Sequence, residues 1–505
     1  MIRYYVALFA VVIASYWNIF PNGYIGDDHY LLENHRFFSD WGNLYLLFTR
    51  DSWDVFWPEH GPVGYWRPLF LASFYFDNCL PLPTLVSHHL VDLLLYFGAV
   101  IVVFRFLFHF VQDATAAALG AVFFAAWPLH TDSVTLMLGR EYSMCAILWI
   151  GAYMYSERYC GRGPPSCLWI SCVFFALSLL CVESAIVFPF MALPMLFRGP
   201  GASGRRVYRL GASFIAVIIT YLAYRKWMIP IKLYPPEHMN LELLWDSGAV
   251  ALRSFRAILW PFDFVVTETP APLVGRVADG FLGLFLGTVG LLAVVISYIK
   301  RCPKGYLPLL LYLTPLLLVI PPYPRGSVYQ DRYLFLPSVG LALAIGYTAG
   351  WLRERGSARL LLLSGGLMGV CVLSFIFTSL ARNFDFRNDI SFWCTEADRQ
   401  RTAFDANKRC GKAFQNVGRD SEALVYYDRA LNLKLHPDVI NDYGVILAGR
   451  GQCKDALRLF RFLRKRDETY IKGWKNEIAC IRQLKDEAQL RRVLPAAKKA
   501  IPREF

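Results

Sequence analysis

The stretch TLVSHHLVDLLLYFGAVIVVFRFLF, residues 84–108, decides the fold class. It is longer than the roughly 20 apolar residues that a helix needs to cross a bilayer. Ten further apolar segments follow the same pattern: 4–20, 112–128, 134–154, 166–182, 184–197, 210–224, 281–299, 306–322, 333–351 and 360–380. Only 18% of the 505 residues are charged, against about 25% in soluble domains. The sequence therefore predicts an all-α polytopic membrane protein with about 11 transmembrane helices.

Basic residues in the connections set the predicted orientation. They form four groups: Arg158 and Arg162; Arg198, Arg205, Arg206 and Arg209; Lys300, Arg301 and Lys304; and Arg353, Arg355 and Arg359. If all eleven segments span the membrane, the four groups lie on one side, and positive loops mark the cytoplasm. The N-terminus is then cytoplasmic, with segment 4–20 retained as a first helix. Loop 21–83 and everything after Leu380 lie on the outer side.

Two stretches read as interfacial rather than spanning. Residues 243–262 are moderately apolar but carry Arg253 and Arg256 on one helical face, which favours an amphipathic helix in the membrane interface. The outer loop 21–83 is rich in tryptophan, as expected of segments at headgroup level. Its tryptophans are Trp41, Trp53, Trp57 and Trp66.

The composition changes beyond residue 383 to a charged, helical pattern with an internal period. Small and aromatic residues occur at the spacing of a tetratricopeptide (TPR) repeat: Gly411, Phe414, Ala423, Tyr427 and Ala430, then Gly444, Ala456 and Phe460. A weaker helical pair at about 470–500 would cap the stack. We therefore expect a transmembrane domain over 1–383 and a short TPR-like helical domain over 384–505, on the outer side.

Composition also argues against some classes of site. The net charge is +13, but no basic helix interleaved with aromatic residues is present, so nucleic-acid binding is not expected. The 12 cysteines form no C-x-x-C pair and no Cys/His cluster with zinc spacing. No metal site is predicted.

Two adjacent carboxylates, Asp27 and Asp28, follow the first apolar segment. Ionisable groups close to the hydrocarbon boundary are functional candidates, and a carboxylate exposed to a water-filled cavity can accept a proton from a hydroxyl group. The alternative is that both cap a juxtamembrane helix, DDHYLLENHRFF. The two interpretations are compatible.

Other polar residues are predicted at the same outer level. They are Arg67, His130, Asp132, Arg140, Glu141, Glu183, Arg325, Asp331 and Arg332. Acids and arginines from separate loops suit a reaction that needs a base and a clamp for an anionic leaving group, because Arg binds phosphate in a bidentate manner. Each residue also has a structural interpretation: the arginines as interfacial anchors, His130 as a structural hydrogen-bonding group, and Asp132 and Glu183 as helix caps.

Eight stretches in order resemble the transmembrane-and-TPR O-mannosyltransferases (the TMTC family) and related bacterial proteins of the glycosyltransferase C superfamily. They include GDDHYLLENHRF, YWRPLFLASFYFDNCL, WPLHTDSVTLMLGREYSMCAILW, LLCVESAIVFPFMALP, DRYLFLPSVGLALA and RNFDFRNDISFW. The resemblance implies a sugar donor carried on a polyprenyl phosphate, Asp27 as catalytic base and Asp28 in support. Arg140, Glu141 and Arg332 correspond to polar motifs of the family, and we expect the donor phosphate to lie against Arg140 or Arg332.

The chain departs from the family pattern in three ways. Val182 stands where Lys is common before the acid of the fifth-to-sixth turn, and Gln330-Asp331 stands where many members have Ala-Glu. The missing cation beside Glu183 is expected to alter how the donor phosphate is held, so the resemblance assigns no particular sugar. The repeat domain is also much shorter than in the animal proteins. This favours a bacterial inner-membrane protein with a periplasmic TPR domain over an enzyme of the endoplasmic reticulum.

The expected function is that of an inverting glycosyltransferase acting on a hydroxyl of an exported protein, which the TPR domain would hold. Transfer to a glycan or lipid is the alternative within the enzyme class. Other classes are a membrane-anchored TPR scaffold and a transporter, the latter if Asp92 and Arg105 line a common path. A divalent cation remains open as a cofactor, with Asp132 and His130 able to contribute to its site.

Overall fold

The computed structural model describes residues 1–33, 35–57, 64–192, 204–229, 241–264, 273–300, 302–316 and 330–501. Every regular element in these ranges is helical, so the predicted all-α class is confirmed. The chain divides into two compact units, Met1–Asn388 and Asp389–Phe505, close to the predicted boundary at 383/384. Each unit is described by itself.

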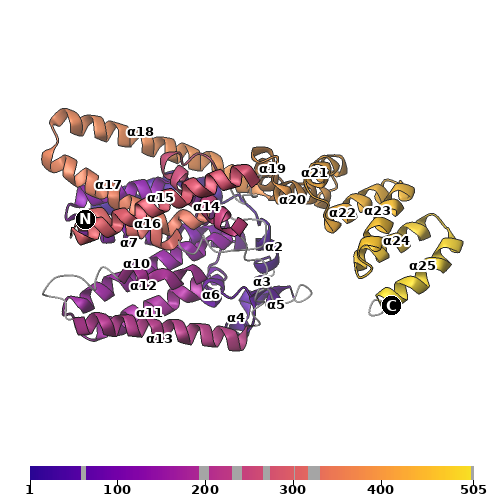
Figure 1. The fold of residues 1–505 in the computed structure, drawn as a ribbon, viewed down its shortest axis with the longest axis horizontal. Coiled ribbons are helices and arrows are strands. Elements are labelled where there is room, and N and C mark those ends of the chain that lie inside the picture. The colour runs from indigo at the N-terminus through magenta and orange to yellow at the C-terminus, as the bar shows by residue number, and fades with distance from the viewer. Residues whose placement is uncertain are drawn as a thin grey trace. The chain divides into compact units, whose positions relative to one another are not determined.

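The first unit is a bundle of apolar helices (Figure 1). Its main helices are α1 Ile2–Tyr16, α7 Thr84–Val111, α8 Ala114–Ala126, α10 Arg140–Cys160, α11 Ser166–Cys181, α12 Phe188–Ala192, α13 Gly204–Met228, α14 Leu241–Leu259, α15 Leu273–Ile299, α16 Pro303–Leu316, α17 Phe335–Arg355 and α18 Ala358–Asn383. Each predicted span overlaps one of them, although residues 193–197 and 317–322 lie outside the described residues.

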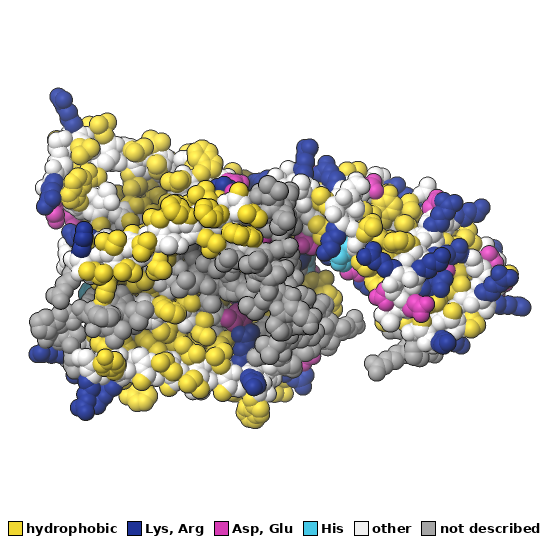
Figure 2. Space-filling view, in the orientation of Figure 1, with side chains coloured by type: hydrophobic (Ala, Val, Ile, Leu, Met, Phe, Trp, Pro, Cys, Tyr) yellow, Lys and Arg dark blue, Asp and Glu magenta, His cyan; other side chains and the backbone are white. Residues whose placement is uncertain are grey.

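Six helices within the described ranges are long and apolar enough to cross a membrane. The number rises to seven if the bent pair Ala114–Ala126 and Pro128–Thr135 counts as one span. A polytopic membrane protein is therefore confirmed, while the total of eleven spans stays a prediction. Side chains on the outside of these helices are mostly hydrophobic (Figure 2), as contact with lipid requires.

Short helices fill the outer loops. They are α2 Asp27–Leu31, α3 His35–Ser39, α4 Leu44–Thr49, α5 Ser52–Phe56, α6 Pro68–Asp77 and α9 Thr131–Thr135. The single juxtamembrane helix expected from DDHYLLENHRFF is thus two helices, α2 and α3. Trp41 is half exposed, but Trp66 is buried and donates from Nε1 to the Phe48 carbonyl at 3.2 Å, so Trp66 belongs to the protein interior and not to the lipid headgroup level.

The outer end of the bundle is tied together by asparagines from the first and last helical regions. Asn18 donates to the Leu380 carbonyl and Asn22 to the Asn383 carbonyl, both at 2.9 Å. Asn383 in turn donates to the Ser15 carbonyl at 2.9 Å. The N-terminus and the α17–α18 turn lie at the opposite end of the bundle from α2 and α3 (Figure 1). The chain therefore leaves the membrane unit on the side that carries the acidic pair.

Close helix packing in the bundle depends on glycine. A Cβ atom on Gly120 of α8 would come within 2.4 Å of the Ala342 carbonyl oxygen of α17, and one on Gly340 within 2.4 Å of the Pro308 carbonyl oxygen of α16. Small residues let the helix backbones approach in this way inside a membrane. α8, α17 and α16 consequently form a tightly packed row.

Two predicted segments have different bounds or surroundings. The fourth span was expected from residue 134, but α10 begins at Arg140, because residues 128–139 form short turns in which Gly139 packs against the backbone of Asp132 and Ser133. α14, expected in the interface, shares a cluster with Trp127 and Tyr312. Whether α14 lies in the interface stays a prediction.

The second unit consists of α19 Asp389–Arg399 followed by three helix pairs: α20 Phe404–Asn416 and α21 Asp420–Leu433, α22 Pro437–Gly449 and α23 Cys453–Arg466, and α24 Ile471–Gln483 and α25 Glu487–Ala500. Gly411 packs against the Tyr427 ring and Gly444 against the Phe460 ring, where added Cβ atoms would come within 2.6 and 2.7 Å. The small and aromatic residues of the sequence repeat therefore meet in space. Unlike the first unit, its surface is rich in charged side chains (Figure 2).

A disulfide joins Cys394 of α19 to Cys410 of α20, across 16 residues of sequence. Sequence analysis missed it, because the two cysteines show no spacing motif. Disulfides persist in oxidising compartments and are rare in the cytosol. The bond is consistent with the expected location of this unit on the outer side.

Candidate active site

The acidic pair at the start of α2 lies in two different environments. Gly26 precedes the helix with φ 57°, in the left-handed region that glycine tolerates best. Asp27 is exposed, whereas Asp28 is only 1% exposed. Asp28 Oδ2 accepts a hydrogen bond from the Ile25 amide at 3.3 Å, and no described residue bonds to Oδ1. The Asp27 carboxyl group is therefore accessible to a substrate, whereas the Asp28 carboxyl group is enclosed by the protein.

Burial raises the pKa of Asp28 to about 8, with the Asp27 charge adding to the effect and Arg332 opposing it. At neutral pH the buried group therefore holds a proton in the resting protein. Carboxylates whose environments differ in this way commonly take different roles in proton transfer. The arrangement leaves Asp27 as the accessible carboxylate of the pair.

Arg332 supplies a cation near this pair. It lies half-buried in the short turn Asp331–Leu334 that leads into α17, and its Nε donates to Gln330 Oε1 at 2.7 Å. Among the residues that the structure describes, no carboxylate forms an ion pair with it. Its terminal nitrogens are available to an anion. Asp132 and Glu141 act on it electrostatically, as does Asp28.

Asp132 is a second buried carboxylate in this region. It is 5% exposed, and both of its oxygens lack a hydrogen-bond partner among the described residues. Buried polar atoms without partners are rare in folded proteins and call for an explanation such as a missing ligand or water. Asp132, Asp28 and Arg332 therefore mark a polar region that substrate or water could complete.

An alternating row of charges continues from Glu141 toward α13. Arg67 pairs with Glu141 through Nη1 and with Glu183 through Nε at 2.8 Å. Arg225 of α13 lies on the other side of Glu183, at 3.6 Å. Burial alone would raise the pKa of Glu183, but Arg67 and Arg225 outweigh it and hold that pKa below its usual range. We call Arg67, Glu141, Glu183 and Arg225 the charge row.

Arg225 was not recognised in the sequence. It follows the apolar run of α13, where an Arg reads as an ordinary interfacial anchor. In the structure it supplies a cation beside Glu183, next to Val182, the position at which a Lys is missing from the family pattern. In this chain the cation beside Glu183 therefore comes from α13, and not from the residue that precedes Glu183.

Arg140, expected to hold phosphate, is instead fully engaged inside the protein. It donates to Asp77 at 2.7 and 3.0 Å, to Asp92 through Nε, to Ser73 Oγ at 3.3 Å and to the His88 carbonyl at 3.1 Å. Its side chain is 0% exposed. All five N–H groups have partners, so Arg140 joins α6, α7 and α10 and has no donor left for a phosphate.

His130 is likewise engaged. Its Nδ1 lies 2.9 Å from the Tyr96 hydroxyl and its Nε2 lies 2.9 Å from Ser338 Oγ, and the ring packs on Phe124 and Phe335. The structure thus gives His130 the place of a structural hydrogen-bonding group between α7, α8 and α17. No group of three or more metal-ligating side chains occurs within the described ranges.

Asp92 and Arg105 do not line a common path. Asp92 is buried against Arg140, whereas Arg105 is exposed and donates to the Tyr5 hydroxyl at 3.0 Å. The observation that would have favoured a transporter is not found. Arg325, another expected member of the polar group, lies outside the described residues.

Comparison with known proteins identifies relatives of this chain by sequence. The chain is 23% identical over 84% of its length to mouse Protein O-mannosyl-transferase TMTC3, and 23% identical over 83% to the human protein of that name. The resemblance to the TMTC family is confirmed. The Drosophila melanogaster Tmtc3 protein matches at 22% identity over 84% of the chain. The TMTC-like chain spans about half the length of these relatives, at 49% of the mouse protein. No family model matches it.

Proposed function

We propose that this protein is a membrane glycosyltransferase that moves a sugar from a polyprenyl-phosphate carrier to a hydroxyl group of an exported protein. The observation that carries the proposal is Arg332, a half-buried arginine with no carboxylate partner in the described part of the chain, within electrostatic range of Asp28. Similarity to proteins named O-mannosyl-transferases supports a transferase of this class.

Asp27 is the proposed general base. It accepts the proton of the acceptor hydroxyl while the hydroxyl oxygen attacks the anomeric carbon. The bond from that carbon to the phosphate oxygen breaks, and the polyprenyl phosphate leaves with the electron pair. Arg332 stabilises the charge that develops on the phosphate, since preorganised cations act most strongly on charge that forms in the transition state. A single displacement inverts the anomeric configuration.

Asp28 supports Asp27 by staying neutral. With its pKa near 8, it holds a proton at neutral pH and leaves one negative charge at the start of α2. A second charge would repel the first and add the cost of a buried, unpaired carboxylate. Asp28 is therefore a positioning residue, and Asp27 is the catalytic residue.

The second unit is the proposed holder of the acceptor. Two of the three helix pairs in the described residues bring glycine against an aromatic ring, at Gly411 and Gly444, which supports a TPR-like stack. Such stacks present an extended groove to partners. The disulfide supports an oxidising location for this unit. We propose the periplasmic side of a bacterial inner membrane, or the lumenal side of the endoplasmic reticulum in a eukaryotic cell.

The test is transfer of sugar from a polyprenyl-phosphate donor to peptides by the purified protein in nanodiscs. General-base catalysis contributes about 10²–10⁴-fold, so Asp27→Asn should lower kcat by that factor. Asp28→Asn mimics the protonated side chain and should retain most activity at pH 7. Asp54→Asn, in the same outer loop, is the control. Wild-type activity in Asp27→Asn, or in the Asp27→Asn, Asp28→Asn double variant, would overturn the proposal.

A further inference from the structure

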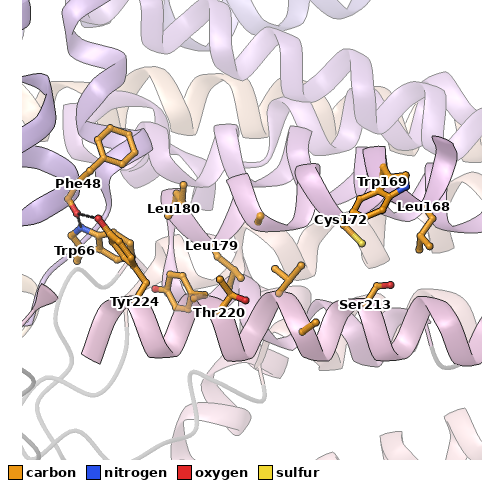
Figure 3. Close-up of a pocket in the computed structure, with 14 residues that line it drawn as sticks. Phe48, Trp66, Leu168, Trp169, Cys172, Leu179, Leu180, Ser213, Thr220 and Tyr224 are labelled. Carbon is orange, nitrogen blue, oxygen red and sulfur yellow. Dashed lines mark hydrogen bonds between the residues drawn. The ribbon is translucent and has the colours of Figure 1, made fainter. Parts of the chain in front are cut away.

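Two apolar cavities, each of about 540 Å³, open between helices of the described membrane unit. One lies between α11 and α13, and none of its described lining residues is charged (Figure 3). The other lies between α8, α17 and α18, and its lining includes Arg353. This second cavity, which we call the α17–α18 cavity, combines apolar walls with a cation.

The α17–α18 cavity is open because α18 packs loosely on the bundle. Leu119 of α8, Leu352 of α17 and Met368 of α18 form part of its walls. Of the most apolar 18-residue window in Ala358–Arg387, only 6% is buried. A Cβ atom on Gly365, which also lines the cavity, would meet no described atom within 4 Å. Since the outside of this apolar helix faces lipid, a chain from the bilayer can enter the cavity from the side.

Arg353 lies at the end of the cavity that is nearest the α17–α18 turn. Its Nε donates to Asp113 Oδ2 at 2.9 Å, while Asp113 Oδ1 accepts from the amides of Thr115 and Ala116 at 2.8 and 3.0 Å. The side chain of Arg353 is 47% exposed, and its terminal nitrogens have no partner among the described residues. Asp113 thus fixes the guanidinium at the start of α8 and leaves the terminal N–H groups to an anion.

Further cations surround this end of the bundle. Figure 2 shows Lys and Arg side chains at the left end of the first unit, where Figure 1 places the N-terminus and the α17–α18 turn. Arg355 and Arg359 flank that turn and are exposed. Arg3 donates to the Tyr4 hydroxyl at 2.9 Å, and this hydroxyl lies 2.8 Å from Thr115 Oγ1 at the start of α8. On the predicted topology this end is cytoplasmic, where the leaflet carries anionic lipids.

The length of the cavity matches one leaflet of the bilayer. Along α17 the cavity extends from Ile345 to Arg353. This distance is about 12 Å, at roughly 1.5 Å per residue. One leaflet of a hydrocarbon core about 30 Å thick measures about 15 Å. The acyl chain of a bilayer lipid has this reach, whereas an isoprenoid chain longer than one leaflet would extend past the cavity.

We infer that the α17–α18 cavity binds an anionic glycerophospholipid of the bilayer, with one acyl chain along α17 and α18 and the phosphate at Arg353. This lipid is neither donor nor acceptor, so the inference does not depend on the proposed function. A zwitterionic lipid brings a cation of its own to Arg353, Arg355 and Arg359, whereas an anionic headgroup adds none. Binding fills the space beside α18 and holds this helix to α17.

The experiment uses the full-length protein in phosphatidylcholine nanodiscs that contain a phosphatidylglycerol with a photoreactive diazirine in one acyl chain. Crosslinks should map to residues 345–353 and 361–368. Gly365→Trp fills the cavity and should lower crosslinking there at least tenfold. Gly366→Trp is the matched control, because this glycine also has open space around it but does not line the cavity, and it should leave crosslinking unchanged. Both variants should elute as the wild type does in size-exclusion chromatography.

Arg353→Gln tests the headgroup end. It should weaken crosslinking by the phosphatidylglycerol probe about tenfold, as for the loss of a hydrogen bond to a charged group, with recovery in Arg353→Lys. Crosslinking by a phosphatidylcholine probe should stay the same in both variants.

Three results would overturn the inference. They are equal crosslinking by the two probes in the wild type, crosslinks confined to other helices, and no effect of Gly365→Trp. Stronger competition by polyprenyl phosphate than by unlabelled phosphatidylglycerol would also contradict it, because the cavity would then belong to an isoprenoid lipid.

Discussion

The two neighbouring aspartates at the start of α2 differ in exposure: Asp27 is exposed to solvent, whereas Asp28 is buried. Burial of Asp28 should make the stability of the protein depend on pH. Its pKa is raised from 3.8 to about 8, so between these values the folded state keeps a proton that the unfolded state has lost. Stability contributed at this site is therefore lost as pH rises from about 4 to about 8.

Asp28→Asn removes this titration and keeps a neutral side chain of the same shape. We expect the variant to be more stable than the wild type, with a gain in Tm that grows between pH 5 and pH 8 and then levels. The measurement is thermal unfolding in detergent at both pH values, with Asp54→Asn as the control. A gain that is the same at pH 5 and pH 8 would contradict the prediction.

Substitutions of Arg332 and Arg140, the two arginines that sequence analysis proposed for the phosphate, should have different effects. Arg332→Gln removes a charge without a carboxylate partner in the described chain, so the protein should fold and its KM for the donor should rise about 10–100-fold, as for the loss of a hydrogen bond to a charged group. Donor titrations of transfer rate measure this. A KM within twofold of wild type would exclude Arg332 from donor binding.

Arg140→Met should instead destabilise the folded protein. It leaves Asp77 and Asp92 buried without their cation, and breaking such a pair costs about 3–5 kcal/mol. The yield of monodisperse protein and its Tm should fall sharply in this variant and not in Arg332→Gln. A stable Arg140→Met protein with a raised KM for the donor would restore the original role of Arg140.

Residue types in the sequence indicated candidate charged residues, but not which of them form ion pairs. The sequence does not distinguish Arg140 from Arg332, because both precede apolar runs. Their difference comes from Asp77 and Asp92, whose helices pack on α10 only in the folded bundle. Arg225 was missed for the same reason, since its partner Glu183 lies on another element.

Packing within the second unit depends on single glycines in its helix pairs. Gly411→Ala would place a methyl group within 2.6 Å of the Tyr427 ring, which costs about 1–3 kcal/mol when the core must shift. Hydrogen exchange of α20 and α21 in the full chain should become faster. Gly449→Ala, at a helical glycine with open space around it, should leave exchange in α22 unchanged or slower.

Helices were the most predictable level of the structure. Apolar runs placed every span near an observed helix, because burying backbone hydrogen bonds in lipid leaves few alternatives to a helix. The bounds were less predictable where the chain turns within apolar sequence, as before Arg140. The cap of α2 at Gly26 and the division between α2 and α3 depend on local backbone conformation, which hydropathy does not report.

At the scale of the whole molecule, the disulfide links redox state to topology. Cys394 and Cys410 should be protected from alkylation in the membrane-inserted protein until a reductant is added. Closing a loop of this size contributes about 3 kcal/mol, so Cys394→Ser, Cys410→Ser should lower the stability of the second unit by a similar amount. Free thiols at both positions in native membranes would place this unit in the cytoplasm and contradict the orientation.

The asparagine contacts at the outer end of the bundle join residues 362 and 361 positions apart. During synthesis, Asn18 and Asn22 must wait for almost the entire membrane unit to emerge before their partners exist. A chain that stops short of residue 380 would lack these two contacts, while the ion pairs of Arg67 with Glu141 and Glu183 could still hold the outer loop. We therefore expect the tie between the first and last helical regions to form only after nearly all of the membrane unit has been made.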